Sequence, residues 1–133
     1  MTADTRTVDS DQQYLQLMQA FGDAWNRHDV SALMDAMTQD CIFEASSGPD
    51  ACGRRYEGAD AVRQAYADIF QAFPDAAWQK MRNFVSGSHG YSEWTFVGTR
   101  PDGERVEVNG CDLFTFRDGL ILTKNSFRKS RTR

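Results

Sequence analysis

The sequence contains few of the residues that typically build disulfide frameworks or metal centres. Three cysteines, Cys41, Cys52 and Cys111, form an odd set without C-x-x-C spacing, which argues against a disulfide scaffold and against a zinc knuckle. No glycine motif for phosphate, no metal-ligand spacing and no nucleophile elbow is present. We therefore expect reduced thiols and, if there is chemistry, chemistry without a metal or other cofactor.

Long apolar runs are also absent, and basic residues are not in excess. No stretch reaches the length of a membrane span, and the N-terminus lacks the basic-then-apolar order of a secretory signal. The formal net charge is -4, which argues against nucleic acid as the main partner. We expect a cytoplasmic protein that binds neither membrane nor nucleic acid. Its 133 residues fit one domain, 1–133, with flexible ends at 1–9 and 129–133.

Helical spacing of apolar residues dominates the first half of the chain. A capping box at Ser10 introduces a first helix that ends near Asn26. Asp29 caps a shorter second helix, whose inner face includes Met37 and which ends near Thr38. Gly58 precedes a third helix, which Pro74 stops. The first-helix stripe consists of Tyr14, Leu17, Met18, Phe21 and Trp25.

The second half of the chain changes to a strand pattern. After a short strand at 41–45 and a loop rich in Gly, Ser and Pro, four β-prone runs are separated by turn residues. These runs are Trp78–Val85, Tyr91–Thr99, Arg105–Phe116 and Leu120–Arg128. Helices followed by a strand meander predict an α+β fold in which helices cover one face of a mostly antiparallel sheet. A curved sheet around a long helix leaves a cone with an open end, where a small apolar ligand fits.

The last two runs form a hairpin around Asp118-Gly119. By the two-residue strand period, one acid, Asp112, shares a face with Val108, Gly110, Phe114 and Phe116. Burial among such neighbours raises the pKa of a carboxyl group unless a cation reaches it.

The register of the hairpin decides whether a cation lies close to the Asp112 carboxyl group. A two-residue loop pairs position 112 with 125 and turns Thr123, Asn125 and Phe127 inward. A three-residue loop with a glycine bulge pairs 112 with 124 and turns Leu122, Lys124, Ser126 and Arg128 inward. In the second case Lys124 faces Asp112 as an ion pair, which is either structural or part of a site.

The stretches AFGDAWNRHDVSALMDAMTQDCIFEA and GCDLFTFRDGLI resemble the nuclear transport factor 2-like superfamily, and within it the SnoaL-like polyketide cyclase and ketosteroid isomerase branch. The resemblance extends from about Gln12 to Phe127. It implies a cystatin-like cone, a curved mostly antiparallel sheet wrapped around three N-terminal helices. It also favours the second hairpin register. Sheet-face homodimers are frequent in this superfamily.

Functional residues of the family carry over only in part. The strand acid of ketosteroid isomerases matches Asp112, but their helix tyrosine falls at Phe21 and their base falls at Ala45. Neither residue can move a proton, which argues against that mechanism. Scytalone dehydratase-like members place histidines in the cone, whereas His28 and His89 fall in a helix corner and a turn, where we expect both to be exposed.

The sequence therefore leaves several functions open. One is a cofactor-independent isomerase, cyclase or lyase that binds a small apolar oxygenated molecule and uses Asp112 as acid or base, oriented by Lys124. Another is a non-catalytic ligand-binding protein, and a third is an interaction module or homodimer that uses the outer sheet face with Leu113, Thr115 and Thr123. The residues expected to bind the ligand are Met18, Phe21, Trp25, Ala45, Tyr56, Phe70, Trp94, Phe114 and Ser126.

Overall fold

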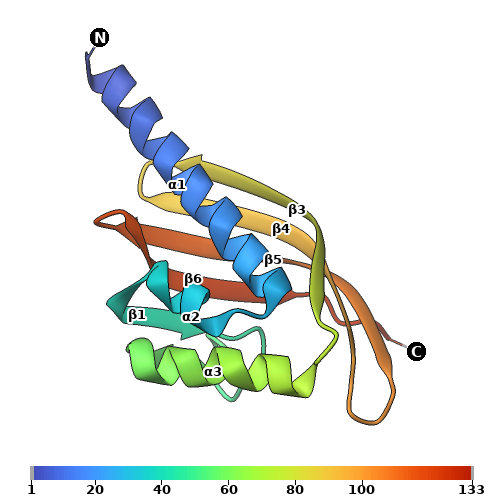
Figure 1. The fold of residues 1–133 in the computed structure, drawn as a ribbon. Coiled ribbons are helices and arrows are strands. Elements are labelled where there is room, and N and C mark those ends of the chain that lie inside the picture. Colours follow the sequence, from blue (N-terminus) through green and yellow to red (C-terminus); the bar gives the residue numbers. More distant parts are fainter. Residues whose placement is uncertain (1, 133) are drawn as a thin grey trace.

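The computed structural model describes the backbone of residues 2–132 and the side chains of residues 10–132. A long helix crosses one face of a curved, unclosed sheet, and two further helices lie beside it (Figure 1). The predicted α+β class is therefore confirmed. The flexibility expected for residues 1–9 and 129–133 stays a prediction; Met1, the side chains of residues 2–9, and Arg133 lie outside the described residues.

The first helix, α1 (Thr2–Arg27), carries the apolar stripe that its spacing predicted. Met18, Phe21 and Trp25 on this stripe are all buried in the core. The predicted helix start at Ser10 is wrong, because α1 continues through that residue. A capping box describes a sequence preference, and nothing at Ser10 forces the backbone to leave the helix.

A Schellman motif ends α1 and leads directly into the second helix. The His28 amide donates to the Trp25 carbonyl and the Asp29 amide donates to the Ala24 carbonyl, while His28 adopts φ 58°. Helix α2 (Val30–Asp35) then begins, with the Asp29 carboxylate accepting a hydrogen bond from an amide of its first turn. The predicted cap at Asp29 is confirmed.

Strand pairing shortens α2 relative to the sequence prediction. Strand β1 (Met37–Glu44) begins at Met37, which we expected on the inner face of a helix ending near Thr38. The Ile121 amide donates to the Ala36 carbonyl, and Met37 pairs with Ile121. Hydrogen bonds within the sheet thus satisfy backbone groups that the local sequence predicts to be helical.

Six strands form one sheet in the order β2-β1-β6-β5-β4-β3. β1 runs parallel to β6, and the other neighbours are antiparallel. The short strand β2 lies in the segment that we expected to be a loop, where it pairs with β1. The bounds of the remaining elements are β2 (Arg55–Glu57), α3 (Ala59–Ala72), β3 (Ala77–Ser86), β4 (His89–Thr99), β5 (Arg105–Arg117) and β6 (Leu120–Arg128).

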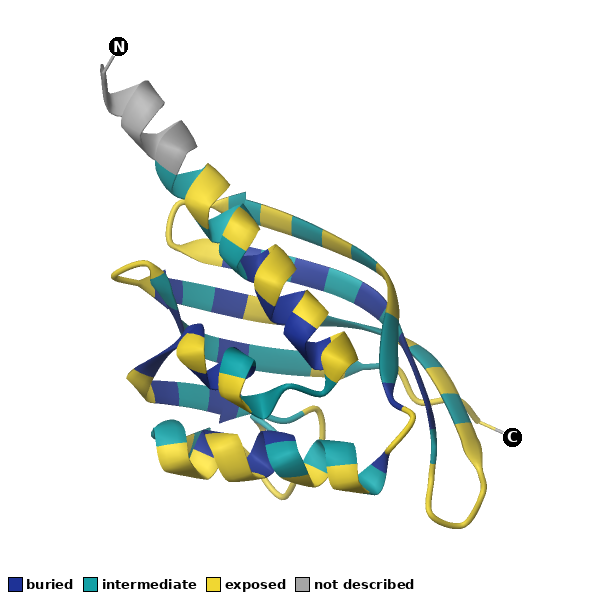
Figure 2. Cartoon of the chain, in the orientation of Figure 1, coloured by how far each residue is buried: buried dark blue, intermediate teal, exposed yellow. Residues whose placement is uncertain are grey.

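The core lies between the helices and one face of the sheet. Buried and exposed residues alternate along β5, so that one strand face points toward the helices (Figure 2). Tyr66 of α3 and Phe114 of β5 belong to the larger cluster, and Trp94 and Phe96 of β4 belong to a smaller one. No helix among the described residues is long and apolar enough to span a membrane.

Candidate functional site

Polar residues from three neighbouring strands line up on the inner face of the sheet. Ser92 of β4 pairs with Asp112 of β5, which in turn pairs with Ser126 of β6. All three lie on the face toward the helices, where Ser92 and Asp112 are buried. The strand period thus placed Asp112 correctly.

The hairpin reaches this arrangement by a register that neither of our two alternatives contained. Its turn is the two-residue loop, since Arg117 pairs with Leu120, but an extra residue, Leu122, then shifts the pairing by one. Asp112 therefore pairs with Ser126, not with position 124 or 125. The bulge turns Lys124 inward, as the second alternative predicted. Leu122, which that alternative also turned inward, is the unpaired bulge residue.

Both carboxylate oxygens of Asp112 have partners. The Trp94 indole Nε1 donates to Oδ2 at 3.0 Å, and the Ser126 hydroxyl donates to Oδ1 at 2.5 Å. The Lys124 ammonium lies 3.2 Å from Oδ1 and donates to the Ser126 hydroxyl at 2.8 Å. A lysine, a serine and an aspartate are thus joined in one hydrogen-bonded group, the Asp112–Ser126–Lys124 network.

Aromatic rings surround the lysine of this network. Nζ of Lys124 lies 5.0 Å from the ring centroid of Trp25, 4.8 Å from Phe43 and 5.8 Å from Tyr66. Burial lowers the pKa of Lys124, while the Asp112 charge opposes this shift. Burial also raises the pKa of the Tyr66 phenol well above its usual value, and the nearby Asp112 charge adds to the effect.

Gly110 makes room for the indole that holds Asp112. It pairs with Trp94 on one side and with Arg128 on the other. A Cβ atom at this position would lie 2.6 Å from the Trp94 ring and 2.5 Å from the Phe127 carbonyl. Any larger residue therefore displaces Trp94, whose position over Gly110 lets Nε1 reach the neighbouring Asp112.

A cavity of about 200 Å³, here called the cone cavity, lies between helices α1 and α3 and the inner face of the sheet, next to the network. Lys124 and Ser126 line it directly, but Asp112 does not, because its oxygens are covered by Trp94, Ser126 and Lys124. The other wall residues are mostly apolar: Trp25, Phe43, Ala45, Ser46, Ser47, Ile69, Phe73, Trp78, Trp94, Phe96 and Arg128.

The structure separates the residues expected to bind a ligand into two groups. Trp25, Ala45, Trp94 and Ser126 line the cavity. The others do not line it: Met18, Phe21 and Phe114 are buried core residues, and Tyr56 and Phe70 pack against that core. Tyr56 stacks on Phe43, and Phe70 stacks on His28.

One of the two histidines differs from its predicted environment. His28 is partly buried, because its Nε2 lies 2.7 Å from the Ala76 carbonyl oxygen and its ring stacks on Phe70 at 4.3 Å. Our expectation that it is exposed is wrong, since tertiary contacts from the β3 side cover the helix corner. His89 is exposed, as predicted. Within residues 10–132, no three His, Cys, Asp or Glu side chains gather as a metal site requires.

Sequence reasoning left several cavity residues out. Our second hairpin register already turned Arg128 inward with Lys124 and Ser126, but we did not count it among the ligand-binding residues. Phe43, Trp78 and Phe96 are apolar strand residues that the sequence does not distinguish from ordinary core. Ser47 belongs to a loop whose path no local pattern specifies.

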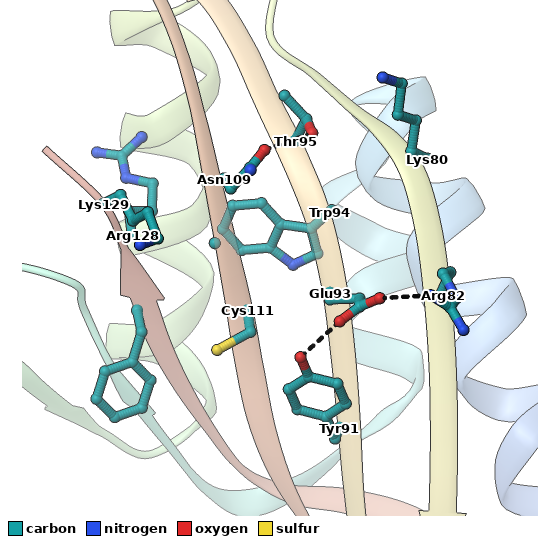
Figure 3. A pocket seen from close by; sticks show the side chains of 12 residues that line it. Lys80, Arg82, Tyr91, Glu93, Trp94, Thr95, Asn109, Cys111, Arg128 and Lys129 are labelled. Atoms are coloured by element: carbon teal, nitrogen blue, oxygen red, sulfur yellow. Dashed lines mark hydrogen bonds and ion pairs between the residues drawn. The ribbon is translucent and has the colours of Figure 1, made fainter. Parts of the chain in front are cut away.

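The outer face of the sheet carries two larger hollows. One, of about 600 Å³, includes Tyr91, whose hydroxyl donates to Glu93 at 2.7 Å, and Arg82, which pairs with Glu93 at 3.1 Å (Figure 3). The other, of about 570 Å³, lies over Phe84 and Leu113. Phe84, Leu113 and Phe127 are the large hydrophobic residues exposed in the described part of the chain, at 45%, 44% and 48%.

The residues expected on this outer face do lie there. Leu113 is exposed, and Thr115 pairs with Thr123 across the hairpin, with their hydroxyl oxygens 2.6 Å apart. The burial pattern shows that these residues point away from the helices. Whether another chain covers them stays a prediction.

Comparison with solved structures finds the same fold repeatedly. A candidate polyketide cyclase from Xanthomonas campestris pv. campestris superposes with a TM-score of 0.81 at 20% identity, covering 90% of this chain and 93% of that one. A protein of unknown function with a nuclear transport factor 2-like fold, from Mesorhizobium loti, gives 0.75 at 26% identity, with 90% and 93% covered. A protein with a ketosteroid isomerase-like fold from Catenulispora acidiphila, in complex with trimethylamine, gives 0.73 at 16% identity, with 84% and 83% covered.

Sequence comparison identifies the family. No curated protein matches the chain. The family model of the SnoaL-like domain matches residues 18–123, which include β1, the third helix, and the strands carrying Asp112 and most of the hairpin. This match extends over more than half of the 133 residues. The resemblance inferred from the sequence is confirmed, and the chain belongs to the SnoaL-like domain family.

Proposed function

We propose that this protein binds a small apolar molecule carrying a carbonyl or hydroxyl oxygen in the cone cavity. We further propose that the Asp112–Ser126–Lys124 network moves a proton to or from it without a cofactor. The observation that carries the proposal is this buried network in the wall of an aromatic cavity. The reaction class is an isomerase, cyclase or lyase reaction next to a carbonyl group.

The size of the cavity limits the ligand that it can hold. A volume of about 200 Å³ admits a single ring and excludes a steroid.

Asp112 has a less direct role in this arrangement than the sequence suggested. Because Ser126 and Lys124 stand between Asp112 and the cavity, a substrate proton reaches the carboxylate through the Ser126 hydroxyl. Lys124, as an ammonium, donates to a developing enolate oxygen. Asp112 then accepts the relayed proton and holds both partners in position.

The proposal is tested with acetophenone as the probe in heavy water. Binding is followed by the fluorescence of Trp25, Trp78 and Trp94, and catalysis by deuterium exchange at the methyl group, which reports proton removal without knowledge of the natural product. We expect the protein to bind acetophenone and to accelerate exchange. Asp112→Asn should bind but lose most of the acceleration, whereas Asp23→Asn, which removes an exposed carboxylate, should not.

The alternative function is ligand binding without catalysis. Phe21 and Ala45 favour it, because neither residue supplies the proton-transfer groups that related isomerases carry. Saturable binding of acetophenone without exchange would support this alternative. Absence of binding would contradict both functions for ligands of this size.

We also propose that a second copy of the chain covers the outer sheet face. Three exposed hydrophobic residues lie there in one region, together with charges of both signs such as Arg82 and Glu93. A two-fold interface places the same patch against itself, and a patch with both charges is self-complementary. Dimerisation is compatible with either function of the cone.

A further inference from the structure

The Lys124 amine lies among groups that line the cone cavity. Lys124 and Ser126 both line it, and Nζ of Lys124 lies 2.8 Å from the Ser126 hydroxyl oxygen. The ring centroids of Phe43 and Trp25, which also line the cavity, lie 4.8 and 5.0 Å from the same nitrogen. A small molecule that occupies the cavity is therefore in contact with the immediate surroundings of Nζ.

The environment of Lys124 differs from that of the other lysines in the chain. The sequence contains three lysines, and the other two, Lys80 and Lys129, are exposed at the hollow on the outer sheet face (Figure 3). An exposed lysine is almost entirely charged at neutral pH, and a charged amine is not a nucleophile. Burial lowers the pKa of Lys124, while the charge and hydrogen bond of Asp112 oppose this shift and the charge of Arg128 adds to it.

The Asp112–Ser126–Lys124 network provides a path by which the amine becomes neutral. The Ser126 hydroxyl accepts from Nζ at 2.8 Å and donates to Oδ1 of Asp112 at 2.5 Å. A proton that moves along this path from Lys124 to Asp112 cancels two charges in a buried, largely apolar space, where charges are costly. The other described residues of the cavity wall offer aromatic, aliphatic, hydroxyl and guanidinium groups, so the neutral amine is the strongest nucleophile among them.

From this arrangement we infer that Lys124 is a catalytic nucleophile, which forms an imine with a small apolar aldehyde or ketone in the cone cavity. The proposed function uses Lys124 only as a hydrogen-bond donor. The covalent step goes beyond that function and shares with it only the entry of a carbonyl compound into the cavity. An iminium withdraws electrons from the neighbouring carbon more strongly than a hydrogen-bonded carbonyl does, so it activates the same class of substrate for proton removal.

The network also balances the protons of this step. Nζ forms a bond to the carbonyl carbon, and the carbonyl oxygen receives a proton from Asp112 through the Ser126 hydroxyl. The nitrogen then loses a proton to the network, which passes it to the new hydroxyl group, and this group leaves as water. The product is an iminium with the same charge as the ammonium that it replaces, and Asp112 is again a carboxylate. The buried ion pair is thus preserved, which avoids the cost of an unpaired charge.

The test traps the imine with benzaldehyde and sodium cyanoborohydride near neutral pH. The borohydride delivers hydride to the iminium carbon and converts the imine into a stable benzylamine. Benzaldehyde has no proton on the carbon next to its carbonyl group, so the trap reports imine formation alone and does not need the proton removal of the proposed function. Peptide mapping by mass spectrometry then measures the rate at each lysine. We expect Lys124 to be labelled at least about tenfold faster than Lys80 and Lys129, because each unit by which a pKa falls increases the neutral fraction about tenfold.

Two variants and one competitor locate the reaction. Lys124→Arg keeps a positive charge beside Asp112 but does not form the imine, so it should lose the fast label. Lys129→Arg makes the same change at an exposed lysine and should keep the fast label. Toluene, which has the shape of benzaldehyde without its carbonyl group, should slow labelling of Lys124 and not that of Lys129. The comparison among the three lysines is made within wild-type protein, so it is decisive even if Lys124→Arg does not fold.

The outcomes separate this inference from the proposed function. Labelling of Lys124 no faster than that of Lys80 and Lys129 would overturn the inference, and so would fast labelling that toluene does not slow. In either case the proposed function stands if the protein accelerates deuterium exchange of acetophenone. Fast, toluene-sensitive labelling of Lys124 without such exchange would support the covalent step and contradict the proposed proton transfer.

Discussion

At the residue scale, the feature that distinguishes this chain is a buried ion pair that borders a cavity. The side chains of Lys124 and Asp112 are 7% and 8% exposed. Removing two charges from water costs several kcal/mol per ion, and only good geometry and further hydrogen bonds offset that cost. Trp94 and Ser126 provide these bonds.

The pair should therefore behave as a unit when it is mutated. Asp112→Asn or Lys124→Met alone leaves one charge buried without its partner, and we expect each to lower the free energy of unfolding by about 3 kcal/mol. The double variant leaves no unpaired charge, so its loss should be clearly smaller than the sum of the two. Urea unfolding of all four proteins at pH 7 measures these differences. Strictly additive losses would contradict the coupling.

Several of these residues could be predicted from the sequence, and others could not. Alternation put Ser126 and Lys124 on the same face of their strand, because a strand has a period of two, but whether that face is the one of Asp112 depended on the hairpin register. Arg100 lies in the turn after β4, and no period connects it to Arg128. Its position over the Phe73 ring depends on tertiary packing, which no local pattern shows.

At the element scale, an ion pair connects β1 to the end of the last hairpin. Arg117 donates to both carboxylate oxygens of Asp40, at 3.0 and 2.6 Å. The hydrogen bonds from Arg117 lower the pKa of Asp40 from 3.8 to about 2.

This shift predicts a pH dependence of stability. Because the folded-state pKa of Asp40 is lower than its unfolded value of 3.8, its stabilising effect is fully present above about pH 4 and is lost as the pH falls toward 2. Asp40→Asn should therefore lose less stability than wild type between pH 4 and pH 2, as measured by the urea midpoint. Asp35→Asn, which removes an exposed carboxylate from α2, serves as the control. Parallel pH profiles for wild type and Asp40→Asn would contradict the prediction.

Most of the elements followed from the sequence, although α1 begins before Ser10 and the short strand β2 was expected to be a loop. The three helices and the four-strand meander were predicted from apolar periods and turn residues. The start of β1 and the bulge at Leu122 were not, because both depend on hydrogen bonds between segments far apart in the chain. The conformational preference of one segment cannot determine how that segment pairs with another strand far away in the sequence.

At the scale of the whole molecule, one face of the sheet is covered by helices and the other is not. The open face carries Phe127, exposed at 48% beside a hollow of about 600 Å³, and Leu113, exposed at 44% beside a hollow of about 570 Å³. Apolar groups exposed together in this way mark an interaction surface more often than isolated ones do.

If this face joins two copies, a charge placed there should separate them. We expect wild-type protein to sediment with the mass of two chains and Leu113→Glu with the mass of one, because a buried interface does not tolerate an unpaired carboxylate. Gln71→Glu places the same charge on the exposed side of α3 and should leave the dimer intact. If wild-type protein sediments as a monomer at all concentrations, the proposed dimer is contradicted.

The sequence alone determined the fold class, the family and the inner position of the strand acid, because helix and strand periods are local and the family pattern extends along most of the chain. The tertiary structure decided which groups meet. It placed a bulge at Leu122, paired Asp112 with Ser126 and Lys124, moved Phe21 into the core, and placed Arg128 over Phe96 at the cavity. These contacts depend on register and side-chain packing between distant segments, which no local pattern contains.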